Sequence, residues 1–140
     1  MHVDRHCVLI IDDTPIMLRI LGDILKADYD ILLARDGIQG INLAKTNKPS
    51  LILLDVVMPD MSGFEVITVL KTDYETENIP VIFITGLDSA KELERGYQLG
   101  ATDYIEKPFV EFVVKKRVEF AIKFLEMERK LEQALKACQL

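Results

Sequence analysis

The sequence contains few of the residues that build disulfide frameworks or zinc sites. Its 140 residues include only two cysteines and two histidines. Cys7 stands in an apolar run and Cys138 lies almost at the C-terminus, while His2 and His6 both belong to the N-terminal tail. Neither a CxxC pair nor a set of Cys and His residues at zinc spacing is present. This cysteine usage indicates a protein of the reducing cytoplasm.

Long apolar runs and an excess of positive charge are missing as well. No apolar run reaches the length that spans a membrane, and the N-terminus, MHVDRHC, lacks the apolar region of a signal peptide. The net charge of −6 at pH 7 argues against nucleic acid or an anionic membrane as a direct partner. Without repeats, low-complexity tracts or flexible linkers, the chain is expected to form one domain.

What the sequence does contain is a regular alternation of strand and helix patterns. Helical segments are predicted from Thr14-Pro15, from Asp36 or Gly37, from Ser62 or Gly63, from Ser89, and after Pro108. Five short apolar runs between them predict buried strands, namely Cys7–Ile11, Ile31–Ala34, Leu51–Leu54, Val81–Thr85 and Asp103–Glu106. This alternation predicts an α/β fold with a doubly wound parallel sheet covered on both faces.

Polar side chains stand where four of the five predicted strands end. Asp12 and Asp13 follow the first strand, and Asp55 follows the third. Thr85 closes the fourth strand, and Lys107 follows the fifth. A single aspartate after a strand is most often a turn former or a helix cap. Ligand sites of doubly wound sheets form beyond the carboxyl ends of the strands, so the four ends together predict one site.

The residue types at these strand ends suit phosphoryl chemistry. Three neighbouring carboxylates raise one another's pKa values unless cations neutralise them, and Mg²⁺ and the ammonium of Lys107 are suited to do so. An aspartate beside such cations can attack phosphorus and form an acyl phosphate. Lys107 and the hydroxyl of Thr85 can bind phosphoryl oxygens, and Gly86 leaves room for the group. The pattern therefore predicts a phosphoryl-acceptor site with Asp55 as the nucleophile.

Over about residues 5–124 the sequence resembles the receiver domain of response regulators in two-component signalling. Asp12-Asp13 resemble the acidic pair of that family, and Asp55 in "LLDVVMPDMSG" resembles the phosphoacceptor. Thr85 in "VIFITG" and Lys107 in "YIEKPF" resemble the switch hydroxyl and the family lysine. The resemblance implies a flavodoxin-like doubly wound five-stranded parallel sheet of order 2-1-3-4-5. It also implies a cis peptide bond between Lys107 and Pro108.

By the same resemblance, the site would bind a magnesium ion. Asp13, Asp55 and the backbone carbonyl of Val57 would be its ligands, and Asp12 would act mostly through water. The apolar side chains of Val57 and Leu87 stand two residues beyond Asp55 and Thr85. Neither can orient an attacking water, so slow self-dephosphorylation is expected.

The resemblance further implies a signalling switch rather than an enzyme with a separate substrate. A histidine kinase or phosphotransfer protein would donate a phosphoryl group to Asp55, and Thr85 would be drawn to the new oxygens. Tyr104 stands at the position of the switch aromatic residue and would rotate inward. The rotation would remodel the surface of the fourth helix, the fifth strand and the fifth helix. The output domain or effector that reads this surface is not specified by the sequence.

Two other functions compete with the phosphorylation switch. The first is a Mg²⁺-dependent phosphatase of the haloacid dehalogenase type, which also uses an aspartyl nucleophile at a strand end. Such enzymes place a second aspartate two residues after the first, where this chain has Val57. The second alternative is a pseudo-receiver that binds partners without being phosphorylated. Pseudo-receivers usually lose part of the acidic set, all of which is kept here.

The predicted last helix is longer than a receiver needs. Its first half is expected to face the sheet with Val110, Val113, Val114, Val118, Ala121 and Ile122. Beyond it, Phe124, Met127, Leu131, Ala134 and Cys138 follow a 3-4-3-4 spacing. Residues 125–140 are therefore expected to extend the last helix as a coiled-coil linker and to form a homodimer. The alternative is a frayed tail, because about two heptads do not prove a coiled coil.

Overall fold

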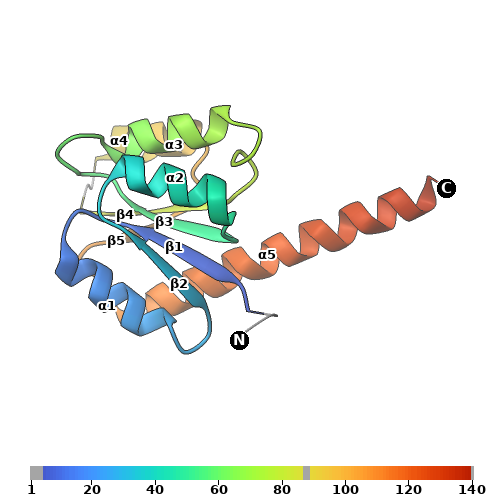
Figure 1. Cartoon of the computed structure of the whole chain (residues 1–140), viewed down its shortest axis with the longest axis horizontal. Coiled ribbons are helices and arrows are strands. Elements are labelled where there is room, and N and C mark those ends of the chain that lie inside the picture. The colour runs from blue at the N-terminus through green and yellow to red at the C-terminus, as the bar shows by residue number, and fades with distance from the viewer. Residues whose placement is uncertain (1–4, 87–88, 140) are drawn as a thin grey trace.

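Five parallel strands form a sheet with helices on both of its faces (Figure 1). The structure is a computed structural model that describes residues 5–86 and 89–139. The strands are β1 (Cys7–Ile11), β2 (Asp30–Ala34), β3 (Leu51–Asp55), β4 (Val81–Thr85) and β5 (Asp103–Glu106). The helices are α1 (Pro15–Leu25), α2 (Gly37–Asn47), α3 (Gly63–Thr72), α4 (Ala90–Gln98) and α5 (Glu111–Cys138).

The strand order β2-β1-β3-β4-β5 confirms the predicted flavodoxin-like fold. The boundaries of two strands differ from the prediction by one residue. β2 begins at Asp30, and β3 includes Asp55, which continues the pairing by lying opposite Ile84 of β4. The expected cis peptide bond between Lys107 and Pro108 is present. Because the strand order reverses between β1 and β3, their carboxyl ends flank the point at which ligands bind in such sheets.

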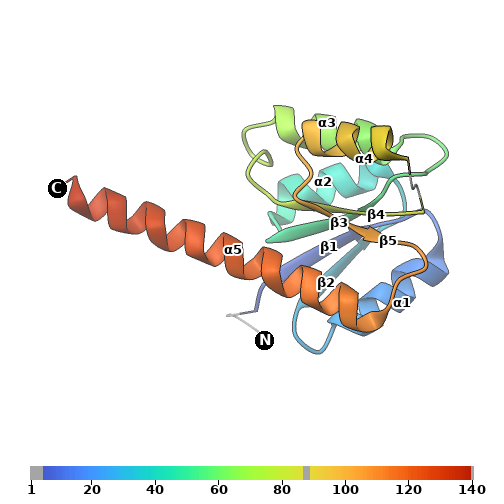
Figure 2. The same ribbon diagram turned by 180° about the vertical axis from the view of Figure 1, so that it is seen from behind.

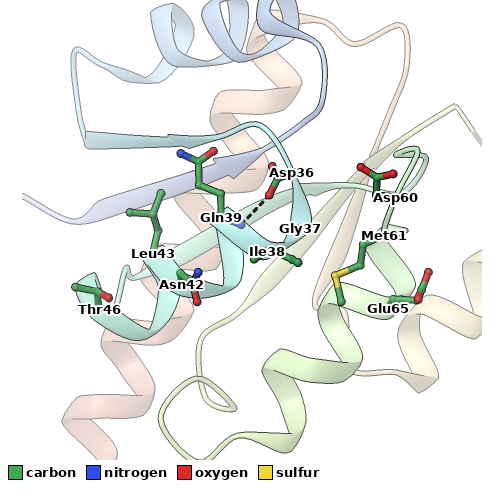
Figure 3. Close-up of a pocket in the computed structure, with 10 residues that line it drawn as sticks. All are labelled: Asp36, Gly37, Ile38, Gln39, Asn42, Leu43, Thr46, Asp60, Met61 and Glu65. Carbon is green, nitrogen blue, oxygen red and sulfur yellow. Dashed lines mark hydrogen bonds between the residues drawn. The ribbon is translucent and has the colours of Figure 1, made fainter.

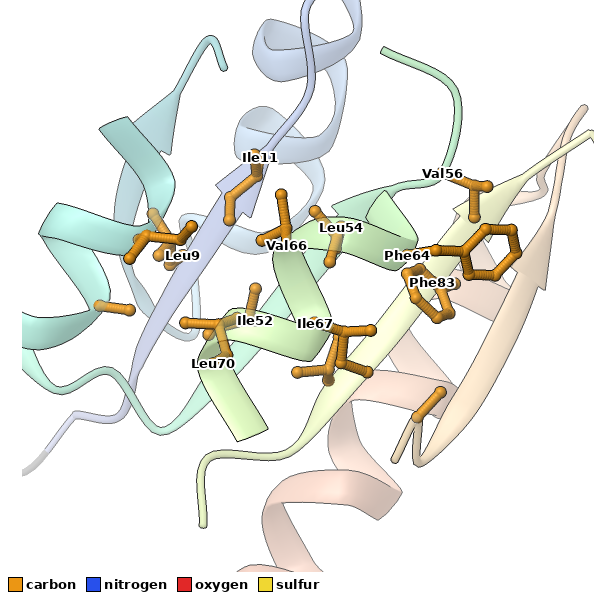
Figure 4. Packing of buried hydrophobic residues seen from close by; sticks show 14 of the residues in the cluster. Leu9, Ile11, Ile52, Leu54, Val56, Phe64, Val66, Ile67, Leu70 and Phe83 are labelled. Atoms are coloured by element: carbon orange, nitrogen blue, oxygen red, sulfur yellow. The ribbon is translucent and has the colours of Figure 1, made fainter. Parts of the chain in front are cut away.

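Two apolar layers hold the helices on the sheet. α1 and α5 cover one face, and α2, α3 and α4 cover the other (Figures 1 and 2). Successive strand residues point to opposite faces, so Ile11 packs under α2 and α3 while Ile10 faces α1 and α5. In the layer between the sheet and α2, α3 and α4, shown in Figure 4, the rings of Phe64 and Phe83 meet edge to face at 5.5 Å. Buried on both sides, the central strands hold the residues at their ends in fixed positions.

Capping side chains define the starts of two helices. The carboxylate of Asp36 accepts a hydrogen bond from the backbone N–H of Gln39 at 2.8 Å and caps α2. Ser62 and Glu65 form a capping box at α3, in which each side chain accepts a hydrogen bond from the other residue's backbone N–H. Both caps match the predicted helix starts. Satisfying the free N–H groups of the first turn fixes where each helix begins.

Gly63 allows α3 to begin directly against the end of β3. A Cβ atom at this position would lie 2.5 Å from the carbonyl oxygen of Asp55 and 2.8 Å from the Cα of Val56. The backbone N–H of Gly63 also donates a hydrogen bond to the carbonyl of Val56 at 2.8 Å. Only glycine permits this close approach of two backbones, which closes residues 57–62 into a loop over the strand end.

The predicted sheet-facing stripe of α5 is partly wrong. Val114, Val118, Ala121, Ile122 and Leu125 are buried, and Leu125 was not predicted. Val110 and Val113, by contrast, are 62% and 37% exposed. Val110 precedes the helix as its N-cap residue, and Val113 is turned by about 100° from its buried neighbour Val114. Within the described ranges, none of the helices is both long enough and apolar enough to cross a membrane.

Candidate functional site

Three carboxylates meet at the carboxyl ends of β1 and β3. Asp12 and Asp13 directly follow β1, and Asp55 is the last residue of β3. Asp12 and Asp55 are 1% and 5% exposed, whereas Asp13 is half-buried. One oxygen from each carboxylate lies within 4.8 Å of the other two. The structure thus brings together the three acidic residues that the strand ends predict.

Lys107 supplies the positive charge at the site. It follows β5, and its backbone N–H donates a hydrogen bond to the carbonyl of Thr85 at 2.9 Å. Its ammonium group donates a hydrogen bond to Asp55 Oδ1 at 3.2 Å and lies 3.7 Å from Asp12 Oδ2. One ammonium therefore faces two buried carboxylates, and the site as a whole retains excess negative charge.

Asp12 is held by a residue that the sequence presented as a helix cap. The hydroxyl and the backbone N–H of Thr14 both donate hydrogen bonds to Asp12 Oδ1, at 2.7 and 2.9 Å. Thr14 therefore makes no side-chain cap to α1 and instead closes an Asx turn that fixes Asp12. The other oxygen, Asp12 Oδ2, is buried and accepts no hydrogen bond. A buried carboxylate oxygen without a donor is a position that a cation would satisfy.

The geometry of the three carboxylates fits a small divalent cation. Two ligands on opposite sides of Mg²⁺ are about 4.2 Å apart, since each Mg–O distance is about 2.1 Å. The separation of up to 4.8 Å between the three oxygens exceeds this span only slightly. Hard oxygen ligands and the orphaned oxygen of Asp12 together favour Mg²⁺.

The pKa of the Asp55 carboxyl is raised above its ordinary value. Burial is the largest cause, and repulsion by the Asp12 carboxylate adds to it. Lys107 and a hydrogen bond from the backbone N–H of Val57 act in the opposite direction but do not cancel the increase. The surroundings of Asp55 in the folded protein therefore disfavour its ionised form.

Thr85 and Gly86 lie at the same end of the sheet as Asp55. Thr85 ends β4, the neighbour of β3, and it is 1% exposed. A Cβ atom added to Gly86 would meet no atom within 4 Å, so the space beside Thr85 is open. This position suits a hydroxyl that reaches a group bound on Asp55, as the sequence predicts. Whether Thr85 acts in this way remains a prediction.

Tyr104 of β5 occupies an inward position beneath α4. Its ring lies 5.5 Å from the ring of Phe83 and 5.0 Å from that of Tyr97, and the side chain is 8% exposed. The hydroxyl donates a hydrogen bond to the carbonyl of Leu93 at 3.0 Å. A Cβ atom at Gly96 would overlap this hydroxyl at 1.7 Å, so the inward position requires glycine there. The sequence showed Gly96 only as an unfavourable residue inside a helix.

Of the two residues predicted to govern the phosphoryl lifetime, Val57 and Leu87, the structure describes only Val57. Val57 is 65% exposed beside Asp55, to which its backbone N–H donates a hydrogen bond. Its side chain is therefore exposed rather than packed in the core. Leu87 lies outside the described residues. The role of the Val57 carbonyl as a metal ligand stays a prediction.

A larger hollow lies on another part of the surface, between α2 and the loop that leads into α3 (Figure 3). Ile38, Leu43 and Met61 form its apolar lining, and Asp60 and Glu65 lie at its edge. None of the carboxylates near Lys107 lines this hollow. The candidate site is therefore the acidic cluster at the strand ends and not this hollow.

The fold and the site together define a class of protein: a flavodoxin-like α/β domain with an acidic, cation-ready cluster and a lysine at its strand ends. The chain belongs to the response regulator receiver domain family, whose family model matches residues 8–119. The site residues Asp12, Asp13, Asp55, Thr85 and Lys107 all fall within this range.

Similar proteins differ in how much of their length corresponds to this chain. A probable cyclic di-GMP phosphodiesterase of Vibrio cholerae is 40% identical over 111 residues, which are 79% of this chain and 25% of that protein. Protein PilH of Pseudomonas aeruginosa is 37% identical over 112 residues, which are 79% of this chain and 93% of PilH. The chain thus spans about a quarter of the first relative and nearly all of the second.

A solved structure supports the same assignment. The signal receiver domain of a putative LuxO repressor protein from Vibrio parahaemolyticus superposes with a TM-score of 0.85 and 29% sequence identity. The alignment covers 91% of this chain and 98% of that domain. Residues 8–119 of the chain therefore form a receiver domain of the kind found in two-component signalling.

Proposed function

We propose that this receiver is switched by transfer of a phosphoryl group from a histidine kinase or phosphotransfer protein to Asp55. The observation that supports this proposal is the buried Asp55 carboxylate, 3.2 Å from the Lys107 ammonium and beside Asp12 and Asp13. An oxygen of Asp55 attacks phosphorus and forms the acyl phosphate bond. The phosphorus–nitrogen bond of the phosphohistidine breaks, and its electron pair remains on the imidazole, which takes up a proton.

The residues around Asp55 have separate parts in this transfer. Asp12, Asp13 and Asp55 would hold Mg²⁺ together with the Val57 carbonyl, and the bound ion would neutralise charge that develops on the phosphoryl oxygens. The ammonium of Lys107 leaves its pairing with the carboxylate to bind one of those oxygens. The hydroxyl of Thr85 donates a hydrogen bond to another.

The proposed readout is a change at Tyr104 and the surface of α4, β5 and α5. Tyr104 lies opposite Phe83 in the pairing of β5 with β4, two residues before the position opposite Thr85. Movement of Thr85 toward a phosphoryl group changes the space available to the Tyr104 ring. To invert the populations of two conformational states from 1:99 to 99:1, a ligand or modification must favour one state by about 5.5 kcal/mol. Several new charge-assisted hydrogen bonds at the phosphoryl group are of this order.

We place the receiver itself at residues 5–124 and its activity in the cytoplasm. The last buried residue of α5 is Leu125, one residue beyond this boundary. Cys7 and Cys138 lie far apart in the sequence and are both free, as expected of a reducing compartment.

The test of the proposal is labelling by acetyl phosphate in the presence of Mg²⁺. The wild-type chain should gain one phosphoryl group, detected by intact mass, and Asp55→Asn should gain none. Asp60→Asn is the matched control, because Asp60 is an exposed acid of the adjacent loop. Labelling of Asp55→Asn to the wild-type level would refute the assignment of Asp55. No labelling of the wild type would favour the pseudo-receiver.

The phosphorylated protein is expected to lose its phosphoryl group slowly, over much longer than seconds. Val57 stands two residues after Asp55 and is exposed, and its apolar side chain cannot orient an attacking water. Val57→Asn should shorten the lifetime by roughly an order of magnitude, since an amide can position the attacking water. Val57→Ala is the control, and it should leave the lifetime nearly unchanged. Equal acceleration by both variants would show that access, and not water orientation, limits the decay.

A further inference from the structure

The C-terminal half of α5 extends away from the domain, to which Glu126 is joined by a partly exposed ion pair of 3.9 Å with His6. The buried face of the helix ends at Leu125, and residues 126–138 are all exposed. Figures 1 and 2 show this part projecting from the sheet layer. It is about 20 Å long at 1.5 Å per residue. A helical segment of this length gains little stability from its own hydrogen bonds, so packing against another surface would be needed to hold it.

An apolar stripe runs along the outer side of α5 at coiled-coil spacing. Phe120, Phe124, Met127 and Leu131 are between 59% and 67% exposed, and Ala134 and Cys138 continue the stripe. The steps between these six residues alternate between four and three. The stripe includes Phe120, which the sequence pattern alone did not distinguish from the sheet-facing half. It lies on the side of the helix opposite Val118 and Ile122, which face the sheet.

We propose that two copies of this chain pair through this stripe as a parallel, in-register coiled coil. The heptad places Phe124, Leu131 and Cys138 at a positions and Phe120, Met127 and Ala134 at d positions. Because the stripe faces away from the sheet along its whole length, the two domains lie on opposite outer sides of the pair. The pairing rests on the described helix and not on the phosphorylation proposed above.

The charges beside the stripe determine the direction of the two helices. In this register Lys123 and Lys130 occupy g positions, and Glu128 occupies the e position between them. A parallel pair brings Lys123 of one copy next to Glu128 of the other, which is attractive. An antiparallel pair would bring the two rows of g lysines together, which is repulsive. Lys123 is free to make this contact, since its side chain is 64% exposed and its bond to Glu119 is a surface pair of 3.4 Å.

A second copy suits this surface better than a membrane or nucleic acid. The projecting segment carries three acidic and three basic residues, Glu126, Glu128 and Glu132 against Arg129, Lys130 and Lys136. With no net charge, the segment lacks the electrostatic attraction that anionic lipids and phosphate backbones require. The apolar stripe and its flanking charges are complementary to themselves, as a twofold pair requires.

The test uses the full chain in sedimentation velocity over a range of concentrations. The wild type should form a dimer, and Phe124→Glu should weaken it by at least ten-fold in dissociation constant. Phe112→Glu is the matched control, because Phe112 is 66% exposed on the same helix but lies off the stripe. A wild type that stays monomeric, or a dimer equally sensitive to both variants, would overturn the proposal.

The orientation is tested by oxidation with copper phenanthroline. In a parallel, in-register pair the two Cys138 thiols face each other, so oxidation should link the chains. Cys138→Ser should abolish the link and Cys7→Ser should not. An antiparallel pair separates the two Cys138 residues by the length of the stripe, so a dimer without the link would refute the orientation. A link that persists in Phe124→Glu would show random collision and would count against the stripe.

Discussion

Gly96→Ala is expected to drive the Tyr104 ring out from beneath α4. An alanine Cβ would lie 1.7 Å from the Tyr104 hydroxyl, 2.9 Å from its Cζ atom and 3.1 Å from Cε2 of Phe83. The hydroxyl is the far end of a side chain that can rotate about χ1, whereas Phe83 is fully buried in β4 and cannot yield. The ring of Tyr104 is therefore the group that has to move.

The expected stability change combines a loss and a gain. Exposing an aromatic ring that is buried in the native protein costs about 1.5–3 kcal/mol. Replacing a helical glycine by alanine stabilises the helix by about 1 kcal/mol. Gly96→Ala should therefore destabilise the protein by about 0.5–2 kcal/mol in urea denaturation. Gly22→Ala in α1 is the matched control, because its nearest neighbours would be 3.8 and 3.9 Å away, and it should stabilise.

The position of the ring can be measured separately from stability. Nitration by tetranitromethane, mapped by mass spectrometry, should reach Tyr104 in Gly96→Ala but not in the wild type. Tyr74 is 83% exposed and serves as the internal standard. In a Tyr104→Ala background, Gly96→Ala should lose most of its destabilising effect, because the overlap with the Tyr104 ring has been removed. A protected Tyr104 in the Gly96→Ala variant would show that α4 moves instead, and would contradict the expected rotation.

The same variant connects the geometry to signalling. If Tyr104 reports the state of Asp55, a ring held outward should leave phosphorylation by acetyl phosphate intact. The inward position, with its hydrogen bond to the carbonyl of Leu93, would then no longer be reached. In the proposed switch Gly96 would be a positioning residue, at a site where its helix propensity is poor.

The fold could be predicted from the sequence because its signals are local. The five apolar runs, the Asp36 and Ser62 caps and the Pro108 break all act within a few residues, and all are found in the structure. The predictions were wrong where two adjacent apolar residues of a helix could each have faced the sheet. Val113 and Val114 are both apolar, and only the contact of α5 with the sheet shows that Val114 is buried and Val113 is not.

The candidate site was predictable in its residues but not in what holds them. Asp12, Asp55 and Lys107 stand at strand ends, so a parallel sheet brings them together. The requirement for Gly63 and Gly96 depends on backbones and rings from distant segments, which no local pattern contains. Thr14 is an intermediate case. Its spacing from Asp12 is that of an Asx turn, but a threonine before proline equally predicts a helix cap.

Asp55→Asn is expected to stabilise the protein at neutral pH when Mg²⁺ is absent. Asp12 and Asp55 face one ammonium at this site, and the pKa of Asp55 is raised by burial and by Asp12. An asparagine removes one of the repelling charges while keeping nearly the same shape. Asp12 remains to pair with Lys107, so no buried charge is left without a partner, and the gain should be about 0.5–2 kcal/mol, the range of substitutions that optimise charge. Asp60→Asn, at an exposed position, should change stability by less than about 0.5 kcal/mol.

The pH dependence of this gain follows from the direction of the pKa shift. Because the pKa of Asp55 is higher in the folded than in the unfolded chain, the folded state holds the proton more tightly. Below the ordinary pKa of aspartate, Asp55 is protonated in both the folded and the unfolded chain, and it does not lower the stability of the folded state. The destabilisation by Asp55 grows as the pH rises from the ordinary pKa to the raised pKa of the folded state, and it reaches its full size above the raised pKa. The advantage of Asp55→Asn should therefore be full at neutral pH and disappear in acid.

Mg²⁺ should reverse the order of the two proteins by relieving the same repulsion. An ion bound only by the folded state at one hundred times its dissociation constant stabilises that state by about 2.7 kcal/mol. The wild type should gain this stabilisation in urea denaturation, and Asp55→Asn, with one carboxylate fewer, should gain much less. An unchanged response to Mg²⁺ in Asp55→Asn would show that Asp55 is not a ligand. A destabilised Asp55→Asn in EDTA at neutral pH would show instead that the bond to Lys107 outweighs the repulsion by Asp12 and the cost of burial.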